Sequence, residues 1–278
     1  MSSILKVQRK RNLSTSQHWD YYEGHRQQVM SLLEEVSAGK KGRLCILGAG
    51  NCNDIELPAL VERFDEIHLV DWDADSLQEG IKKQGIARES VVLHTGIELT
   101  GIGHYIERWK KTPPSNRDID QGISLLSEPL DVGIDTAFDV VLSSSLLTQL
   151  IELPIALLGS NHSRTEEVVL KIRAAHFRLM ASLMAARGTG VLVTELISSN
   201  TCKELFQCPE DRLSELYYQL IEEQRYFQGT NPKTLIPALL EDPFMSSQIA
   251  ETKLTAPWRW LLGPERSFLA YGFVFRKK

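Results

Sequence analysis

The feature that most constrains the fold is a glycine turn directly after a short apolar run. Residues 44–47 are all apolar, and Gly48 and Gly50 stand in the turn that follows them. A second apolar run, residues 67–70, ends at Asp71, and the residues between the two runs have a helical pattern. This order of strand, tight loop, helix and strand indicates an α/β fold. A ligand can approach the backbone closely at the turn, because glycine has no Cβ.

Further strand-sized apolar runs alternate with helical stretches along the rest of the chain. They cover residues 91–94, 138–142, 191–196, 258–262 and 268–275. The link between the last two runs, residues 263–267, is too short for a parallel crossover, so these runs should form an antiparallel hairpin. The pattern predicts a Rossmann-like, doubly wound α/β fold. Its sheet should be mostly parallel and seven-stranded, with an antiparallel C-terminal hairpin.

An N-terminal region precedes this core. Apolar residues recur at helical spacing over residues 14–36, and Ser14 and Gln17 offer a capping box for one helix. We therefore expect an N-terminal arm and a capping helix over residues 1–39. The arm carries four basic residues that we expect to be solvated and mobile: Lys6, Arg9, Lys10 and Arg11.

The remaining residues, 40–278, are expected to form one domain. Two stretches within it lack the regular alternation of strands and helices, at about residues 100–135 and 200–255. Long irregular connections inside a compact domain are uncommon, so both stretches are interpreted as insertions that shape a binding site.

Composition narrows the class of protein. The chain has 31 basic and 36 acidic residues, a net charge of −5, which argues against binding nucleic acid through many phosphate contacts. Its apolar runs are far shorter than the roughly 20 residues that span a bilayer, and no signal-peptide pattern follows the basic residues. Four cysteines without a CxxC pair are typical of a reducing compartment. We expect a cytoplasmic protein with no membrane or nucleic-acid partner, and the oligomeric state stays open.

Asp71 adds chemical meaning to the glycine turn. It lies 23 positions beyond Gly48, at the end of the second predicted strand. A carboxylate there can accept hydrogen bonds from both hydroxyls of a ribose, which indicates a cofactor that contains adenosine. The dinucleotide fingerprint needs a third glycine at position 53, where this chain has Asn53, so an NAD(P) site is less favoured.

With these motifs, residues 40–278 resemble the class I S-adenosylmethionine-dependent methyltransferases. In that family the glycine loop contacts the methionine part of the cofactor, an acid ending the second strand holds the ribose, and an acid after the third strand faces the adenine. The resemblance implies S-adenosyl-L-methionine as cofactor. It also implies these cofactor-binding residues: Gly48, Ala49, Gly50, Asn51, Asn53, Asp71, Trp72, Glu98, Leu99, Ser143 and Ser144.

The chain departs from the family pattern in the glycine loop. The family often has an acid where this chain has Leu47, and a glycine where it has Cys52. Asn51, Asn53 and Asp54 could supply polar groups for the methionine ammonium and carboxylate instead. The other interpretation of Asn53 and Asp54 is that they cap the following helix.

Catalytic candidates come from the predicted N-terminal helix, where Tyr22, His25 and Arg26 share a face. Tyr22 or His25 could act as a general base, and the alternative is that this aromatic face simply packs on the sheet. The serines after the fourth strand, residues 143–145, do not ionise near neutral pH. Signatures of nucleobase methylation are absent from the sequence, and its histidines show no metal-ligand spacing, so no metal is expected.

These observations predict an enzyme that transfers a methyl group from S-adenosylmethionine to an oxygen or nitrogen atom of a small-molecule acceptor. Positioning of the acceptor supplies much of the rate in such a displacement, so the motifs do not identify the acceptor. Two alternatives remain open. One is a non-catalytic S-adenosylmethionine-binding or scaffold protein, and the other, less favoured, is an NAD(P)-dependent oxidoreductase.

Overall fold

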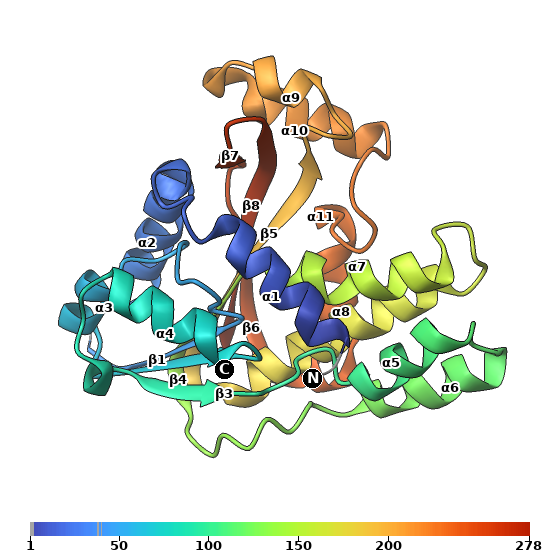
Figure 1. The fold of residues 1–278 in the computed structure, drawn as a ribbon, viewed down its shortest axis with the longest axis horizontal. Coiled ribbons are helices and arrows are strands. Elements are labelled where there is room, and N and C mark those ends of the chain that lie inside the picture. The colour runs from blue at the N-terminus through green and yellow to red at the C-terminus, as the bar shows by residue number, and fades with distance from the viewer. Residues whose placement is uncertain (1–2, 38, 40) are drawn as a thin grey trace.

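A single mixed sheet of eight strands forms the centre of the computed structural model (Figure 1), which describes residues 3–37, 39 and 41–278. The predicted domain boundary at residue 40 lies outside the described residues. The strands are β1 (Arg43–Leu47), β2 (Glu66–Asp71), β3 (Val92–Thr95), β4 (Phe138–Ser144), β5 (Met184–Ser198), β6 (Ile249–Leu254), β7 (Trp258–Gly263) and β8 (Arg266–Lys277).

The strand order confirms the predicted fold class. The sheet runs β3-β2-β1-β4-β5-β8-β6, with β7 also paired to β8. Strands β1 to β5 are mutually parallel, and β8 is antiparallel to β5, β6 and β7. The predicted C-terminal hairpin is β7 and β8. The sheet has one strand more than the predicted seven. The additional strand is β6, which lies inside the stretch 200–255 that was expected to be an insertion, and it pairs only with β8.

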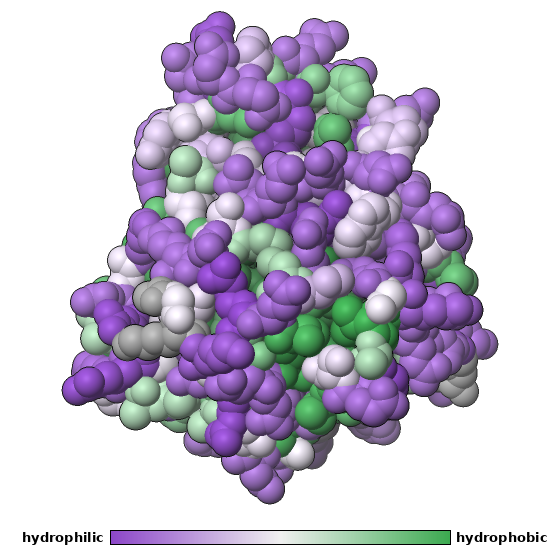
Figure 2. All heavy atoms as spheres, turned by 90° about the vertical axis from the view of Figure 1, so that its left-hand side faces the viewer, coloured by the Kyte–Doolittle hydropathy of each residue, from purple (hydrophilic) through white to green (hydrophobic). Residues whose placement is uncertain are grey.

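Helices cover both faces of the sheet. They are α1 (Ser3–Thr15), α2 (Glu23–Ser37), α3 (Leu57–Arg63), α4 (Ala74–Lys83), α5 (Gly103–Lys111), α6 (Asn116–Ser124), α7 (Leu147–Leu158), α8 (Thr165–Leu183), α9 (Glu204–Gln207), α10 (Leu213–Glu222), α11 (Pro232–Glu241) and α12 (Pro243–Gln248). Successive residues of a strand point to opposite faces, so Leu44 and Ile46 of β1 pack in one core, with α2, α3 and α4. Cys45 and Leu47 pack in the other, with α5, α7 and α8. The surface over α2 and α3 is mostly hydrophilic, with one group of hydrophobic side chains in its lower half (Figure 2).

The N-terminal region differs from the prediction. Two helices, α1 and α2, replace the single helix expected from residue 14, and Ser14 donates a hydrogen bond to the carbonyl of Arg11 rather than capping a helix. The basic residues were expected to be solvated and mobile, which is wrong for Arg9 and Arg11, whereas Lys6 and Lys10 are exposed. Arg9 forms an ion pair of 3.2 Å with Asp73 after β2, and Arg11 one of 2.7 Å with Glu152 on α7. These acids hold α1 across the carboxyl ends of the parallel strands (Figure 1).

The contact between β5 and β8 gives a test of the packing. Gly190 stands directly opposite Phe275, and a Cβ at position 190 would overlap the fully buried ring of Phe275. We expect Gly190→Ala to lower the free energy of unfolding by about 1–3 kcal/mol, because an overpacked core must shift. Adding Phe275→Leu should restore part of the loss. Urea denaturation of the two single variants and the double variant measures the coupling, and purely additive losses would contradict this packing.

Candidate functional site

A cavity of about 680 Å³ opens at the carboxyl ends of β1, β4 and β5. Its lining comes from α1, the glycine loop after β1, one face of α7, the ends of β4 and β5, and the turn between β7 and β8. The strand order reverses between β1 and β4, since the chain passes from β1 to β2 on one side and returns to β4 on the other. Ligands of open α/β sheets bind at such a switch point.

The glycine loop has a backbone shape that other residues adopt with difficulty. Gly48 and Gly50 have φ values of +70° and +49°, and a Cβ at Gly48 would lie 2.8 Å from Leu146. The amides of Gly48 and Ala49 donate to the Val70 carbonyl of β2, at 2.8 and 3.2 Å. Cys52, which stands where the resembling family often has glycine, also has a positive φ of 55°. Cys52 therefore adopts the left-handed backbone conformation although it is not a glycine.

Asp71, at the end of β2, holds the glycine loop in place through its carboxylate. One carboxylate oxygen accepts a hydrogen bond of 2.8 Å from the amide of Gly50, and the other accepts one of 2.8 Å from the amide of Asp73. Burial raises the pKa of Asp71 to about 6, and these hydrogen bonds oppose the rise. Asp71 is not among the residues that line the cavity. In this structure it positions the loop, and its predicted contact with a ribose stays a prediction.

The other cofactor candidates divide into two groups. Gly48, Ala49, Gly50, Asn51, Asn53 and Ser144 line the cavity, whereas Asp71, Trp72, Glu98, Leu99 and Ser143 do not. Both carboxylate oxygens of Glu98 accept hydrogen bonds from backbone amides, those of Thr100 and Gly103, where α5 begins. Ser143 is buried in a 2.8 Å hydrogen bond with His176. The adenine contact of Glu98 stays a prediction.

The two catalytic candidates lie in different environments. Tyr22 lines the cavity, but burial and the nearby charge of Asp54 raise its pKa well above the usual value, so the phenol stays protonated. His25 is fully buried and does not line the cavity. It accepts a hydrogen bond of 3.1 Å from Trp258 and stacks on Trp260 at 4.4 Å. The structure therefore gives His25 a packing contact, the alternative considered for this aromatic face.

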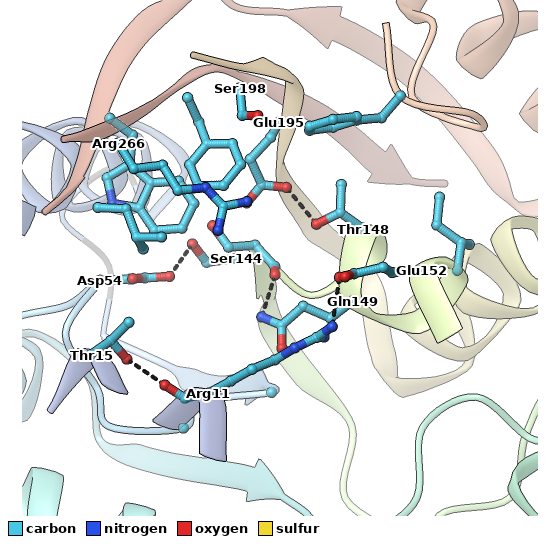
Figure 3. Close-up of a pocket in the computed structure, with 18 of the residues that line it drawn as sticks. Arg11, Thr15, Asp54, Ser144, Thr148, Gln149, Glu152, Glu195, Ser198 and Arg266 are labelled. Atoms are coloured by element: carbon cyan, nitrogen blue, oxygen red, sulfur yellow. Dashed lines mark hydrogen bonds and ion pairs between the residues drawn. The ribbon is translucent and has the colours of Figure 1, made fainter. Parts of the chain in front are cut away.

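The cavity also contains charged residues that the sequence analysis did not single out. Glu195, near the end of β5, accepts a 2.6 Å hydrogen bond from Thr148 on α7, and Arg266 reaches in from the turn before β8 (Figure 3). Asp54 accepts a 2.7 Å hydrogen bond from Ser144. Burial raises the pKa of Glu195. The sequence signal for Glu195 was an acid inside the apolar run 191–196, an expensive position for a side chain that only packs.

Within the described part of the chain, no group of three or more His, Cys, Asp or Glu side chains could hold a metal ion. Among the same residues no helix has both the length and the apolar character needed to cross a bilayer.

The sheet order defines a Rossmann-like α/β protein with a cavity at its glycine loop. No protein-family model matches the chain, and no curated protein matches it. Solved structures with a similar fold include N-methyltransferase NodS from Bradyrhizobium japonicum WM9 with S-adenosyl-L-homocysteine, at 10% identity and a TM-score of 0.47, covering 91% of this chain and 86% of that one. Another is magnesium protoporphyrin IX methyltransferase from Synechocystis PCC 6803, at 13% identity and a TM-score of 0.46, covering 92% and 84%. At this distance the chain's own residues have to carry the functional assignment.

The raised pKa of Asp71 predicts how stability depends on pH. Between the pKa of about 3.9 in the unfolded chain and about 6 in the folded protein, the unfolded chain releases the proton first. The free energy of unfolding should therefore fall by about 3 kcal/mol as pH rises through this interval. Asp71→Asn should remove that contribution. Urea denaturation of both proteins between about pH 4 and pH 7 checks it: their difference should change across the window, and parallel curves would contradict it.

Proposed function

We propose that this protein is an S-adenosylmethionine-dependent methyltransferase that modifies an oxygen or nitrogen atom of a small-molecule acceptor. The observation that carries the proposal is the glycine loop, whose left-handed Gly48 and Gly50 open directly into the cavity. Backbone without Cβ atoms allows a ligand to approach, and the loop stands at the switch point of the sheet.

The residues of the cavity fit part of this cofactor. Its volume of about 680 Å³ falls in the range of small-molecule and cofactor sites. Asn53 lines the cavity and is 5% exposed, and its Oδ1 has no hydrogen-bond partner among the described residues. With Asn51 and Asp54 it would face the methionine ammonium and carboxylate. When bound, the cofactor supplies an electrophilic methyl group, and the chain has to hold an acceptor in line with it.

The alternatives have less support. An NAD(P) site would lack the third glycine, because Asn53 stands there and its side-chain amide donates a 2.9 Å hydrogen bond to the carbonyl of Thr15. A scaffold that only binds the cofactor does not need open space beyond the loop, whereas this cavity continues to Glu195 and Phe268. The acidic net charge supports a small-molecule acceptor over nucleic acid, and a cytoplasmic location rests on composition alone.

Isothermal titration calorimetry tests the cofactor. We expect binding of S-adenosylmethionine and S-adenosylhomocysteine and none of NAD. Asp71→Ala should weaken binding of both by about tenfold or more, because the Gly50 amide loses the charged acceptor that shapes the loop.

Asp139→Ala is the matched control. Asp139 also accepts a backbone amide hydrogen bond of 2.8 Å, from Arg43, but at the opposite end of β1 from the cavity. This variant should bind the cofactor as the unmodified protein does. Binding of NAD without binding of S-adenosylmethionine would reject the proposed function, and equal losses in the two variants would reject the specific role of Asp71.

A further inference from the structure

Three aromatic side chains form a continuous wall on one side of the cavity, which we call the aromatic wall: Tyr22, Trp260 and Phe268. The rings of Tyr22 and Trp260 have centroids 5.2 Å apart, and those of Trp260 and Phe268 are stacked at 5.0 Å. All three rings line the cavity, and each residue is at most 8% exposed. His25 and Phe268 both stack on Trp260, so the aromatic wall offers a ligand an apolar surface.

Glu195 lines the same cavity without an ion-pair partner among the described residues. It is 2% exposed, and no Lys or Arg of the described residues lies within ion-pair distance of its carboxylate. Its contacts are with neutral donors: the Thr148 hydroxyl at 2.6 Å, the Ser145 hydroxyl and its own backbone amide. A buried carboxylate is costly unless a cation or several donors satisfy it. The cavity therefore contains a buried acid that neutral donors contact and that no Lys or Arg of the described residues pairs with.

A second carboxylate and an orphan acceptor increase this negative character. Asp54 accepts the Ser144 hydroxyl, and its nearest cationic candidate is the buried His25, with Nε2 at 3.7 Å. The buried Asn53 Oδ1 on the same cavity lacks a donor among the described residues. Each of these oxygens can accept a hydrogen bond from an N–H group, and none of them can donate one.

Arg266 is the cation that stands closest to this arrangement. Its guanidinium carbon lies 4.7 Å from the centroid of the Phe268 ring, so a cation already rests on the aromatic wall. The residue is exposed at the start of β8, and no acid of the described residues forms an ion pair with it. Arg266 extends into the cavity from its rim. Because it carries a positive charge, the competing interpretation is an acceptor with a negative charge.

We propose that the acceptor is an aliphatic amine with an apolar body, bound with its ammonium group at Glu195 and its body against the aromatic wall. This inference rests on the proposed function and names the acceptor class for it. An ammonium nitrogen has no lone pair, so it must lose a proton before it can attack a methyl group. The Glu195 carboxylate can take that proton, and burial, which raises the pKa of Glu195, favours the protonated acid that results.

The test compares three probes that share one aromatic body and differ in charge: phenethylamine, phenethyl alcohol and hydrocinnamate. Their affinities are measured by ligand-observed NMR titration on the full chain, with and without S-adenosylhomocysteine. We expect phenethylamine to bind at least about tenfold more tightly than either of the others, as a charged hydrogen bond in a buried site implies.

Glu195→Gln should abolish this preference. Glutamine keeps an oxygen that can accept the Thr148 hydrogen bond, so the cavity should keep its shape while it loses its charge. Glu251→Gln, on the exposed edge strand β6 of the same sheet, is the matched control and should preserve the preference. Arg266→Gln should not weaken binding of the amine.

The outcomes separate this inference from the proposed function. Preference for hydrocinnamate that is lost in Arg266→Gln would overturn the amine acceptor in favour of an anionic one, and equal or no binding of the three probes would overturn it too. Binding of S-adenosylhomocysteine without the amine preference would reject only this inference. An amine preference that Glu195→Gln abolishes, in a chain that does not bind S-adenosylhomocysteine, would reject only the proposed function.

Discussion

The cavity depends on hydrogen bonds that fasten the glycine loop to the end of β2. The Val70 carbonyl accepts the amides of Gly48 and Ala49, and the Asp71 carboxylate accepts the amide of Gly50. These contacts hold the loop in a left-handed shape and direct its far side toward the ends of β4 and β5. The Val70 carbonyl and the buried Asp71 carboxylate thus fix the floor of the site together, although Asp71 does not line the cavity itself.

The amino-acid sequence predicted most of the fold because its signals are local. Alternation of apolar runs with helical stretches indicates a doubly wound sheet, and the short link of residues 263–267 allows only a hairpin, which is present as β7 and β8. Strand β6 was not predicted from the sequence, and the reason is physical. It is an edge strand whose residues alternate weakly between buried and exposed positions, so its pairing to β8 is decided by tertiary contacts.

The parts of the site that were not predictable depend on contacts between distant segments. α1 has no strong apolar stripe, and polar contacts with Asp73 and Glu152 hold it in place. No pattern in the sequence near Arg9 or Arg11 predicts that these arginines pair with acids elsewhere in the chain. Glu195 is an acid inside an apolar run, but only the assembled sheet shows that it lines a cavity. The roles of Asp71 and Glu98 in cofactor binding remain predictions, since backbone amides occupy both carboxylates in this structure.

The lining of the cavity joins segments from opposite ends of the described chain. Gln8 and Asn12 of α1 stand on one side of it, and Arg266 and Phe268 of β8 on another. A ligand held between these segments acts as a reversible cross-link across nearly the whole polypeptide, and it stabilises the folded state by mass action. Occupancy of the cavity and protection of α1 against proteolysis are therefore linked quantities, so the first helix, which lines the cavity, is a natural reporter of ligand binding.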